Sequence, residues 1–478
     1  MLPTEEVLLD KESIKVVPAE VAWYYKIIPY KNENGTLQLF IDEEELEKPD
    51  IKRELEIALG VDIRLIAKGH DFIERALARN YVKDITSTSQ STLSISNKNF
   101  VSELIQDAQA VRSSDIHIEV YEQKCRIRFR IDGKLIDRIR LEKSEYPALV
   151  NKIKIMAGLD ISEKRLPQDG RIFFDSGEVK FDIRVSILPT LHGEKIVLRI
   201  LGGAATSAEL DALGFSEIDL LRYKESIRKP NGIILISGPT GSGKTTTLYS
   251  TLKLLNKETT NVVTIEDPIE YTLEGVNQVQ VKEEIGLSFS GALRTFLRQD
   301  PDVIMVGEIR DSETASLAIR AALTGHLVLS TIHTNSAWGT IARLVDMGVP
   351  AFLLANTLNA TLAQRLIRRL CVSCKEYKPI RDDVWPQNFK RKNLITACYH
   401  AKGCKECFFT GYRGRMAVYE VIPVDSQVSE FIVTSGEGSS EYFASLGVKT
   451  LQETALGILR EGETSIEEIY PLLIDEQY

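Results

Sequence analysis

The spacing of apolar residues changes several times along the chain. From residue 213 to about residue 370, short apolar runs alternate with helical stretches, which predicts a parallel sheet with crossover helices. Residues 124–141 alternate with a period of two on both sides of an Asp-Gly dipeptide, a strong hairpin signal. A second strand pair, turning at Ser176-Gly177, is expected over residues 170–188. The pattern therefore predicts an α/β chain in which antiparallel hairpins precede a parallel sheet.

Two segments rich in small or polar residues divide this pattern into three parts. Residues 84–97 (DITSTSQSTLSISN) and 201–212 (LGGAATSAELDA) are expected to be linkers. They separate a small α/β domain at residues 1–83, an α+β domain at residues 98–200 and a longer α/β domain at residues 213–478. A prior of about 150 residues per domain also gives roughly three domains.

Composition and charge narrow the function classes. The hydrophobic fraction is 43% and the charged fraction 27%, as in ordinary globular proteins, and the net charge is −9. Binding to nucleic acid needs many cations, so the acidic balance argues against DNA or RNA as the main partner. The sequence has no apolar run of about 20 residues, and its start is acidic rather than signal-like, which predicts a cytosolic protein. Six cysteines in a chain of this length are no disulfide scaffold.

The stretch SGPTGSGKTTT, residues 237–247, fits the phosphate-binding pattern G-x-x-x-x-G-K-[ST]. It follows an apolar strand and precedes a helix, the context in which backbone N–H groups and a helix N-terminus bind phosphate. Lys244 is expected to reach the β- and γ-phosphates, and the Thr245 hydroxyl to ligate Mg²⁺. The residues predicted to bind nucleotide are Gly238, Pro239, Thr240, Gly241, Ser242, Gly243, Lys244, Thr245 and Thr246. The nearest match to a guanine-reading motif, residues 256–259, lacks its Asp, so ATP is the expected nucleotide.

Acidic residues and histidines follow the later apolar strands. Glu266, with Asp267 and Glu270 beyond it, follows one strand, and Glu308 follows another. The second strand resembles a Walker B strand with Gly in place of the usual Asp. Ligand groups collect at the carboxyl ends of such strands, so these acids are candidates for binding Mg²⁺ or orienting water. His326 and His333 flank a third strand, and one of them is expected to sense the γ-phosphate.

Four cysteines have the spacing of a metal site. They form C-x₂-C-x₂₉-C-x₂-C, which supplies four thiolates for a closed structural Zn²⁺ site. The predicted ligands are Cys371, Cys374, Cys404 and Cys407. With no open coordination position, the metal is not expected to take part in catalysis. Cys125 and Cys398 have no comparable partners and are expected to be buried or neutral thiols.

The order of these motifs resembles the secretion ATPases that power type II secretion and type IV pilus assembly. The resemblance rests on GPTGSGKT, IEDPIE, MVGEIRD and TGHLVLSTIHTN, and it runs from about residue 98 to the end of the chain. It implies a RecA-like P-loop ATPase domain that includes the zinc module 371–407 and C-terminal helices. It also implies a preceding PAS-like α+β domain and a small N-terminal docking domain.

The resemblance also implies roles for particular residues. Members of the family are hexamers in which arginines of the preceding domain approach the ATP phosphates. Arg184 and Arg199 match those arginines, and Arg294 and Arg298 match further basic residues near the nucleotide. The predicted catalytic residues are Glu266, Glu308, Lys244, Arg184 and Arg199. The family suggests water activation by Glu266 and the Mg²⁺ side for Glu308, and the sequence leaves that division open.

The resemblance places the chain within the family and suggests a partner. A four-cysteine insert is typical of the secretion and pilus-assembly branch, which favours assembly or export over retraction. Residues 1–83 are expected to dock on the cytoplasmic part of an inner-membrane platform protein. The predicted function is a cytoplasmic, homo-hexameric ATPase of type II secretion, with type IV pilus assembly as the alternative. A DNA-binding zinc protein and a non-hydrolysing ATP-binding switch are the other classes considered.

Overall fold

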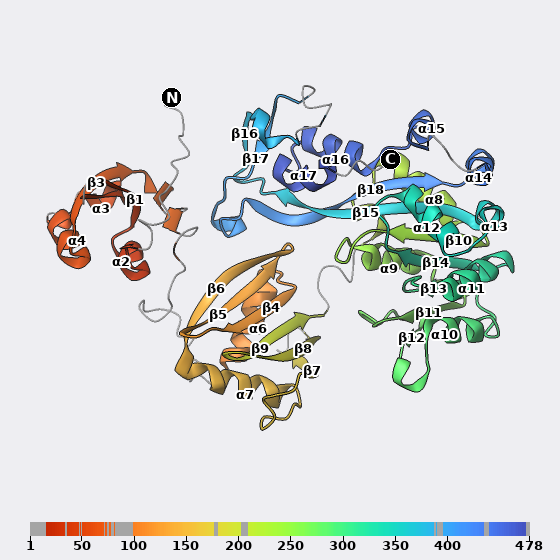
Figure 1. The fold of residues 1–478 in the computed structure, drawn as a ribbon, viewed down its shortest axis with the longest axis horizontal. Coiled ribbons are helices and arrows are strands. Elements are labelled where there is room, and N and C mark those ends of the chain that lie inside the picture. Colours follow the sequence, from red (N-terminus) through yellow and green to blue (C-terminus); the bar gives the residue numbers. More distant parts are fainter. Residues whose placement is uncertain are drawn as a thin grey trace. The chain divides into compact units, whose positions relative to one another are not determined.

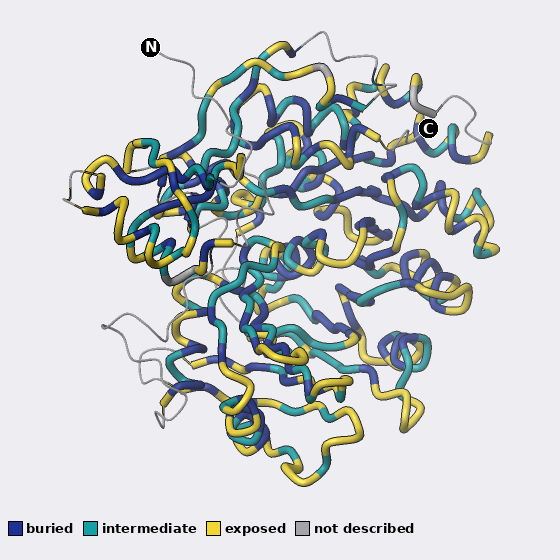
Figure 2. The backbone as a smooth tube through the Cα atoms, turned by 60° about the vertical axis from the view of Figure 1, so that its left-hand side comes forward, coloured by how far each residue is buried: buried dark blue, intermediate teal, exposed yellow. Residues whose placement is uncertain are grey.

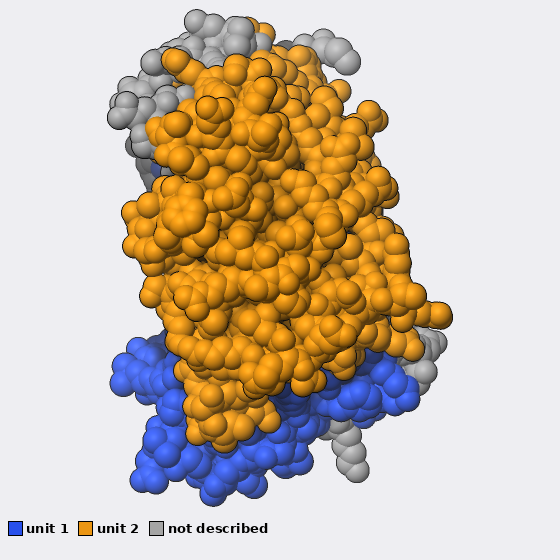
Figure 3. Space-filling view, turned by 90° about the vertical axis from the view of Figure 1, so that its right-hand side faces the viewer, with its two compact units in different colours: residues 1–201, 403–410 blue, residues 202–402, 411–478 orange. Residues whose placement is uncertain are grey.

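The structure is a computed structural model that describes residues 16–33, 36–46, 48, 50–70, 72–73, 76–77, 81, 99–175, 180–201, 209–386, 389, 395–434 and 439–474. The predicted linker 84–97, most of the linker 201–212 and the turn at Ser176-Gly177 lie outside these residues. The chain divides into two compact units, residues 1–201 with 403–410 and residues 202–402 with 411–478 (Figure 3). The three-domain boundaries stay a prediction.

The N-terminal segment forms a three-stranded sheet with short helices. Its elements are α2 (Ala19–Tyr24), β1 (Ile27–Glu33), β2 (Thr36–Asp42), α3 (Glu43–Leu46), α4 (Ile51–Leu59) and β3 (Asp62–Lys68). Strand β2 pairs antiparallel with β1 and parallel with β3. Buried residues of the sheet and of α2 and α4 share one hydrophobic core, so the segment has a core of its own.

Residues 99–201 form an antiparallel six-stranded sheet in the order β6-β5-β4-β9-β8-β7 (Figure 1). The elements are α6 (Phe100–Ala110), β4 (Asp115–Val120), β5 (Lys124–Ile131), β6 (Lys134–Glu142), α7 (Tyr146–Met156), β7 (Gln168–Asp175), β8 (Lys180–Thr190) and β9 (Gly193–Ile200). The predicted hairpin is β5–β6, whose turn residues Asp132 and Gly133 both have positive φ (47° and 84°). Such angles suit a two-residue hairpin turn. The apolar face of the sheet packs against α6 and α7 in one core.

The larger unit contains a seven-stranded sheet in the order β12-β11-β13-β14-β10-β15-β18 (Figure 1). Its strands are β10 (Gly232–Ser237), β11 (Val262–Glu266), β12 (Asn277–Gln280), β13 (Val303–Val306), β14 (Leu327–Ile332), β15 (Leu358–Leu370) and β18 (Tyr412–Pro423). All neighbours are parallel except β15 and β18. The predicted parallel sheet is confirmed. The sequence did not indicate β18, which pairs antiparallel with β15, because 41 residues separate these two strands along the chain.

Helices cover both faces of this sheet. Every residue of β10, β11, β13 and β14 is buried, as expected for strands covered on two sides (Figure 2). One face packs against α8 (Glu217–Ile227) and α9 (Lys244–Leu255). The other face packs against helices from both halves of the unit. These are α10 (Phe289–Phe296), α11 (Ser312–Leu323), α12 (Ala337–Asp346), α13 (Ala351–Thr357), α14 (Ser426–Val433), α15 (Ser439–Ser445), α16 (Leu451–Arg460) and α17 (Ile466–Ile474).

Candidate nucleotide site and metal centre

The loop between β10 and α9 has a shape that requires glycine at two positions. Gly238 has φ 145°, and a Cβ there would lie 2.4 Å from the Gln364 carbonyl oxygen. Gly243 has φ 90°, and a Cβ there would lie 2.8 Å from Gln364 Nε2. The same amide nitrogen donates to the carbonyl of Ser242 (2.9 Å). Gln364 on β15 therefore supports the loop directly, a contact that no sequence motif revealed.

Lys244 begins α9, and its ammonium donates to the carbonyls of Gly238 (2.6 Å) and Pro239 (3.1 Å). Burial lowers the pKa of Lys244, and the negative charge of Glu308 acts in the opposite direction. Thr245 follows and is exposed. The first N–H groups of a helix have no intrahelical acceptor, and they lie at the positive end of the helix dipole. The loop residues 238–246 thus surround a helix terminus of the kind that binds phosphate.

Three of the predicted side chains lie at or just beyond the carboxyl ends of strands, at the edge of the sheet that carries this loop. Glu266 is the last residue of β11, Glu308 lies two residues after β13, and His333 directly follows β14. The strands run parallel, so these carboxyl ends meet at the edge where β10 enters the loop. His333 Nε2 lies 3.3 Å from Glu308 Oε2. The structure therefore brings Glu308 and His333 together beside the P-loop strand.

His326 lies at the opposite edge of the sheet. It precedes β14, and its carbonyl accepts from the N–H of Gly232 at the start of β10 (3.1 Å). Its Nδ1 contacts the carbonyl of Ala321 (2.8 Å) and the hydroxyl of Thr324 (3.2 Å), which closes the end of α11. Of the two histidines, the structure places only His333 beside the acidic residues.

Arg310 was not predicted, although it stands two residues after Glu308 in the MVGEIRD motif. Its guanidinium pairs with Glu308 and lies 3.6 Å from Asp267 Oδ2. It therefore joins the acids that follow β11 and β13. The planar guanidinium group of arginine binds carboxylate and phosphate oxygens equally well. The position of Arg310 in the motif could therefore have indicated that it belongs to the site.

Arg294 on α10 and Arg298, two residues beyond the end of that helix, lie on an exposed surface. Arg294 pairs with Glu313 of α11, and Arg298 donates to the carbonyl of Arg294 (2.9 Å). Both side chains are exposed. These contacts link the end of α10 to the start of α11.

Arg184 and Arg199 are direct cross-strand neighbours on β8 and β9. Arg171 on β7 pairs with Arg184, and Asp115 on β4 pairs with Arg199, so the four residues form one row across the sheet. Arg199 Nε donates to Asp115 Oδ1 (2.9 Å). Residues directly opposite in a sheet share a face, so Arg171 extends a basic row that strand register alone reveals.

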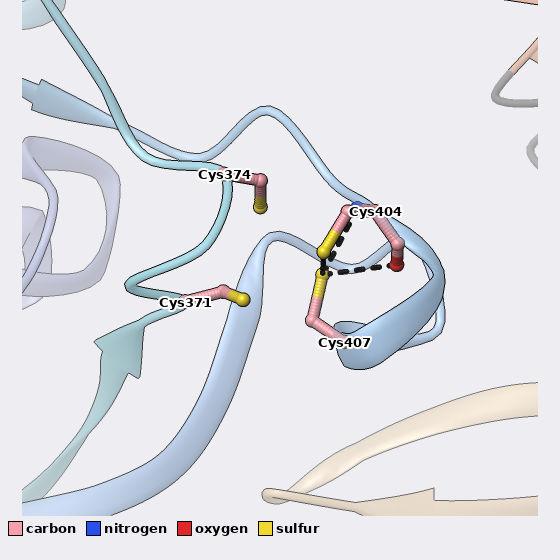
Figure 4. Close-up of side chains that lie close together, drawn as sticks. All are labelled: Cys371, Cys374, Cys404 and Cys407. Carbon is pink, nitrogen blue, oxygen red and sulfur yellow. Dashed lines mark hydrogen bonds between the residues drawn. The ribbon is translucent and has the colours of Figure 1, made fainter. Parts of the chain in front are cut away.

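The four predicted zinc ligands lie together (Figure 4). The sulfurs of Cys371, Cys374, Cys404 and Cys407 all lie within 4.8 Å of one another. The sulfurs of Cys404 and Cys407 are 3.7 Å apart, close to the edge of about 3.8 Å that a tetrahedron with Zn–S bonds of about 2.3 Å requires. The N–H of Cys404 also donates to Cys407 Sγ (3.1 Å). The donor set and its size therefore fit a closed structural zinc site.

A charged pair joins the hairpin beside the cysteines to α17. This hairpin consists of β16 (Glu376–Pro379) and β17 (Ala397–His400). His400 Nε2 lies 3.5 Å from Cys398 Sγ, and its Nδ1 lies 3.5 Å from Glu467 Oε1. These two contacts raise the pKa of His400 to about 9, and the contact with His400 lowers the pKa of Glu467 to about 2.

The two remaining cysteines lie away from the cluster. Cys398 is buried beside His400, and Cys125 is fully buried in the core of the antiparallel sheet. Burial raises the pKa of Cys125 to about 11, so its thiol is neutral at physiological pH.

Among the residues that the structure describes, no helix is both long enough and apolar enough to cross a bilayer.

A RecA-like sheet with a P-loop, and with carboxylates on the neighbouring strand ends, defines the class of P-loop ATPases. Residues 90–471 match the family described as "Type II/IV secretion system protein". The chain therefore belongs to that family, as its motifs predicted, and it is an ATP-hydrolysing enzyme. The expected α/β fold with a RecA-like ATPase domain is confirmed.

Individual relatives agree with this assignment. The chain is 40% identical to the type IV pilus assembly ATPase PilB of Myxococcus xanthus, over 96% of this chain and 86% of that protein. It is 46% identical to the type II secretion system protein E of Pseudomonas aeruginosa, over 79% of this chain and 75% of that protein. The solved ATPase DotB of Legionella pneumophila has a TM-score of 0.61 at 22% identity, covering 82% of this chain and 99% of that one. The pilus retraction motor PilT with bound ADP has a TM-score of 0.54 at 26% identity, covering 78% and 97%.

Proposed function

We propose that this ATPase powers the assembly of a pseudopilus in type II protein secretion. The observation that supports ATP hydrolysis is the meeting of the P-loop, Glu308 and His333 at one edge of the sheet. A carboxylate and an imidazole beside a phosphate-binding loop can respond to the presence of the γ-phosphate. The names of several relatives, which are type II secretion proteins, support this system.

In the proposed site, each side chain acts on a different part of ATP. Lys244 leaves its two carbonyl acceptors to neutralise the β- and γ-phosphates. Mg²⁺, held by the Thr245 hydroxyl on the side of Glu308, would supply further charge neutralisation. Glu266 orients the attacking water, and His333 relays the state of the γ-phosphate to Glu308.

The arginine row would complete the site. We assign Arg184 and Arg199 to the charge that develops on the transferred phosphoryl group. A guanidinium placed there is worth about 10³ or more in rate. The chain would act as a homo-hexamer in the cytoplasm, held at the inner membrane by residues 1–83 bound to a platform protein, and it would need no nucleic acid.

Type IV pilus assembly is the second candidate, and one observation favours it. The match to the pilus ATPase spans 96% of this chain, against 79% for the secretion protein. Affinity capture of the full chain from crosslinked membranes, followed by mass spectrometry, separates the two systems. A secretion platform supports the first proposal, and a pilus platform supports the second.

Steady-state phosphate release tests the ATPase site. The Lys244→Ala variant should lose turnover by at least about 10²-fold, because no other group on the loop carries a positive charge. Lys257→Ala is the matched control, since it removes an exposed lysine just beyond α9. Near-normal turnover of Lys244→Ala would refute the assignment of the loop.

A further inference from the structure

The carboxylate of Glu266 is held by three donors inside the protein. The residue is only 3% exposed. Its Oε1 accepts from the hydroxyl of Thr264 (2.7 Å) and from Gln278 Nε2 (3.0 Å), and its Oε2 accepts from the hydroxyl of Tyr249. Burial disfavours the charged form of a carboxylate, and donated hydrogen bonds favour it. These three donors therefore fix the orientation of the Glu266 carboxylate at the end of β11.

The donors come from three different elements. Thr264 is on β11 itself, and Gln278 is its register partner on β12. Tyr249 belongs to α9, the helix whose first residue is Lys244. Tyr249 is therefore the donor that links the Glu266 carboxylate to the phosphate-binding helix.

Tyr249 is itself fixed by its surroundings. It is fully buried, and its ring packs edge-on against Tyr271, with centroids 4.6 Å apart. Its hydroxyl accepts from the N–H of Glu270 (3.3 Å), and Gln278 Nε2 lies 3.4 Å away. One phenol thus contacts the acid, the segment that follows it and the strand beside it.

Glu308 has different surroundings. Its side chain is 16% exposed and it pairs with Arg310 and His333 at the edge of the sheet. The two acids that follow β11 and β13 are therefore not equivalent, since only Glu266 is held by neutral donors from the interior.

We propose that Tyr249 is a positioning residue for ATP hydrolysis. Through its hydroxyl it holds the Glu266 carboxylate in a fixed orientation relative to the helix that carries Lys244. The inference rests on the proposed role of Glu266 in orienting water. Gln278 supports the same carboxylate from β12, so loss of either donor should affect the same catalytic step.

The test compares two buried tyrosines, Tyr249 on α9 and Tyr223 on α8, in the full-length ATPase. In Tyr249→Phe, kcat should fall roughly tenfold, the expected loss for one hydrogen bond to a charged group. KM for ATP should stay within about twofold, because the loop and Lys244 are untouched.

Tyr223→Phe is the matched control. Tyr223 is fully buried on α8, and its hydroxyl bonds to Thr251 of α9 (2.7 Å). Its loss should leave kcat and KM for ATP unchanged. Gln278→Met, which removes a second donor to the Glu266 carboxylate, should lower kcat without raising KM for ATP, as Tyr249→Phe does.

The outcomes separate this inference from the proposed function. If Tyr249→Phe lowers kcat no more than Tyr223→Phe does, or if KM for ATP rises as much as kcat falls, the positioning role is wrong. If Glu266→Gln hydrolyses ATP normally, Glu266 has no role in turnover, and the proposed division of roles fails first. An inactive Glu266→Gln, together with a lowered kcat at unchanged KM in Tyr249→Phe and Gln278→Met, supports both.

Discussion

A buried ion pair between α7 and β9 allows a quantitative prediction for the antiparallel sheet. The Lys154 side chain is 0% exposed and that of Glu194 is 9% exposed, with Nζ 2.6 Å from Oε1. Nζ also donates to the carbonyl of Glu163 (2.6 Å) in the loop before β7. Glu194 Oε1 has no hydrogen-bond donor among the described residues, so the contact with Lys154 is mainly Coulombic.

The magnitude follows from charge and burial. At an effective dielectric constant of about 20, two unit charges at this distance attract by roughly 6 kcal/mol. Desolvation costs several kcal/mol per ion, so the intact pair contributes little net stability. Removal of one partner leaves the other charge buried alone, which costs about 3–5 kcal/mol. Lys154→Met or Glu194→Gln should therefore destabilise the sheet far more than the double replacement Lys154→Met with Glu194→Leu.

Hydrogen exchange with mass spectrometry is the suitable assay, because a chain with two compact units has no single free energy of unfolding. Peptides from α7 and β9 should open roughly 10² to 10⁴ times more often in each single variant and within about tenfold of wild type in the double variant. Lys164→Met removes an exposed lysine beside Glu163 and should change little. A double variant that opens as often as the single variants would refute the reasoning, because the loss would then come from packing.

Three further predictions concern the zinc module and the arginines. The folded pKa of His400, about 9, exceeds its ordinary value of 6.5, so its stabilisation is complete below about pH 6.5 and is lost as the pH rises through 9. After allowance for solvent screening, this stabilisation by His400 is worth about 1–2 kcal/mol. Hydrogen exchange of β17, corrected for the intrinsic effect of pH on the exchange rate, should therefore accelerate between about pH 6.5 and 9 in wild type but not in His400→Gln. Cys404→Ser should abolish stoichiometric zinc by elemental analysis, and retained zinc would contradict the four-cysteine site. Arg184→Ala should bind a fluorescent ATP analogue normally but release phosphate at least about 10³-fold more slowly, and unaltered release would exclude that role.

Local sequence signals predicted the parts of the site that lie within one motif. The P-loop, the ends of β11 and β13 and the cysteine pairs all follow from residue types at short spacing. Strand register and burial were not available from the sequence. Arg171 lies beside Arg184 because β7 and β8 pair in that register. The buried carboxylate of Glu266 is held by a hydrogen bond from Tyr249 on α9.

The two histidines show the same limit. His326 and His333 are equivalent in the sequence, since each lies next to the same apolar run. Strand direction separates them, because only the carboxyl end of β14 faces the P-loop edge. The sequence could place a histidine beside the nucleotide, but only the folded sheet indicates which one.

The long separation of β15 and β18 along the chain has a consequence for folding. Leu370 on β15 pairs with Tyr412 on β18, although 41 residues separate them. Closing a flexible loop of that length costs entropy that grows with the logarithm of its size. Metal capture by Cys371 and Cys407 would bring the ends of the excursion together before the strands pair. A nascent chain deprived of zinc would therefore keep the outer edge of β15 open for longer, and an open edge strand is a template for aggregation.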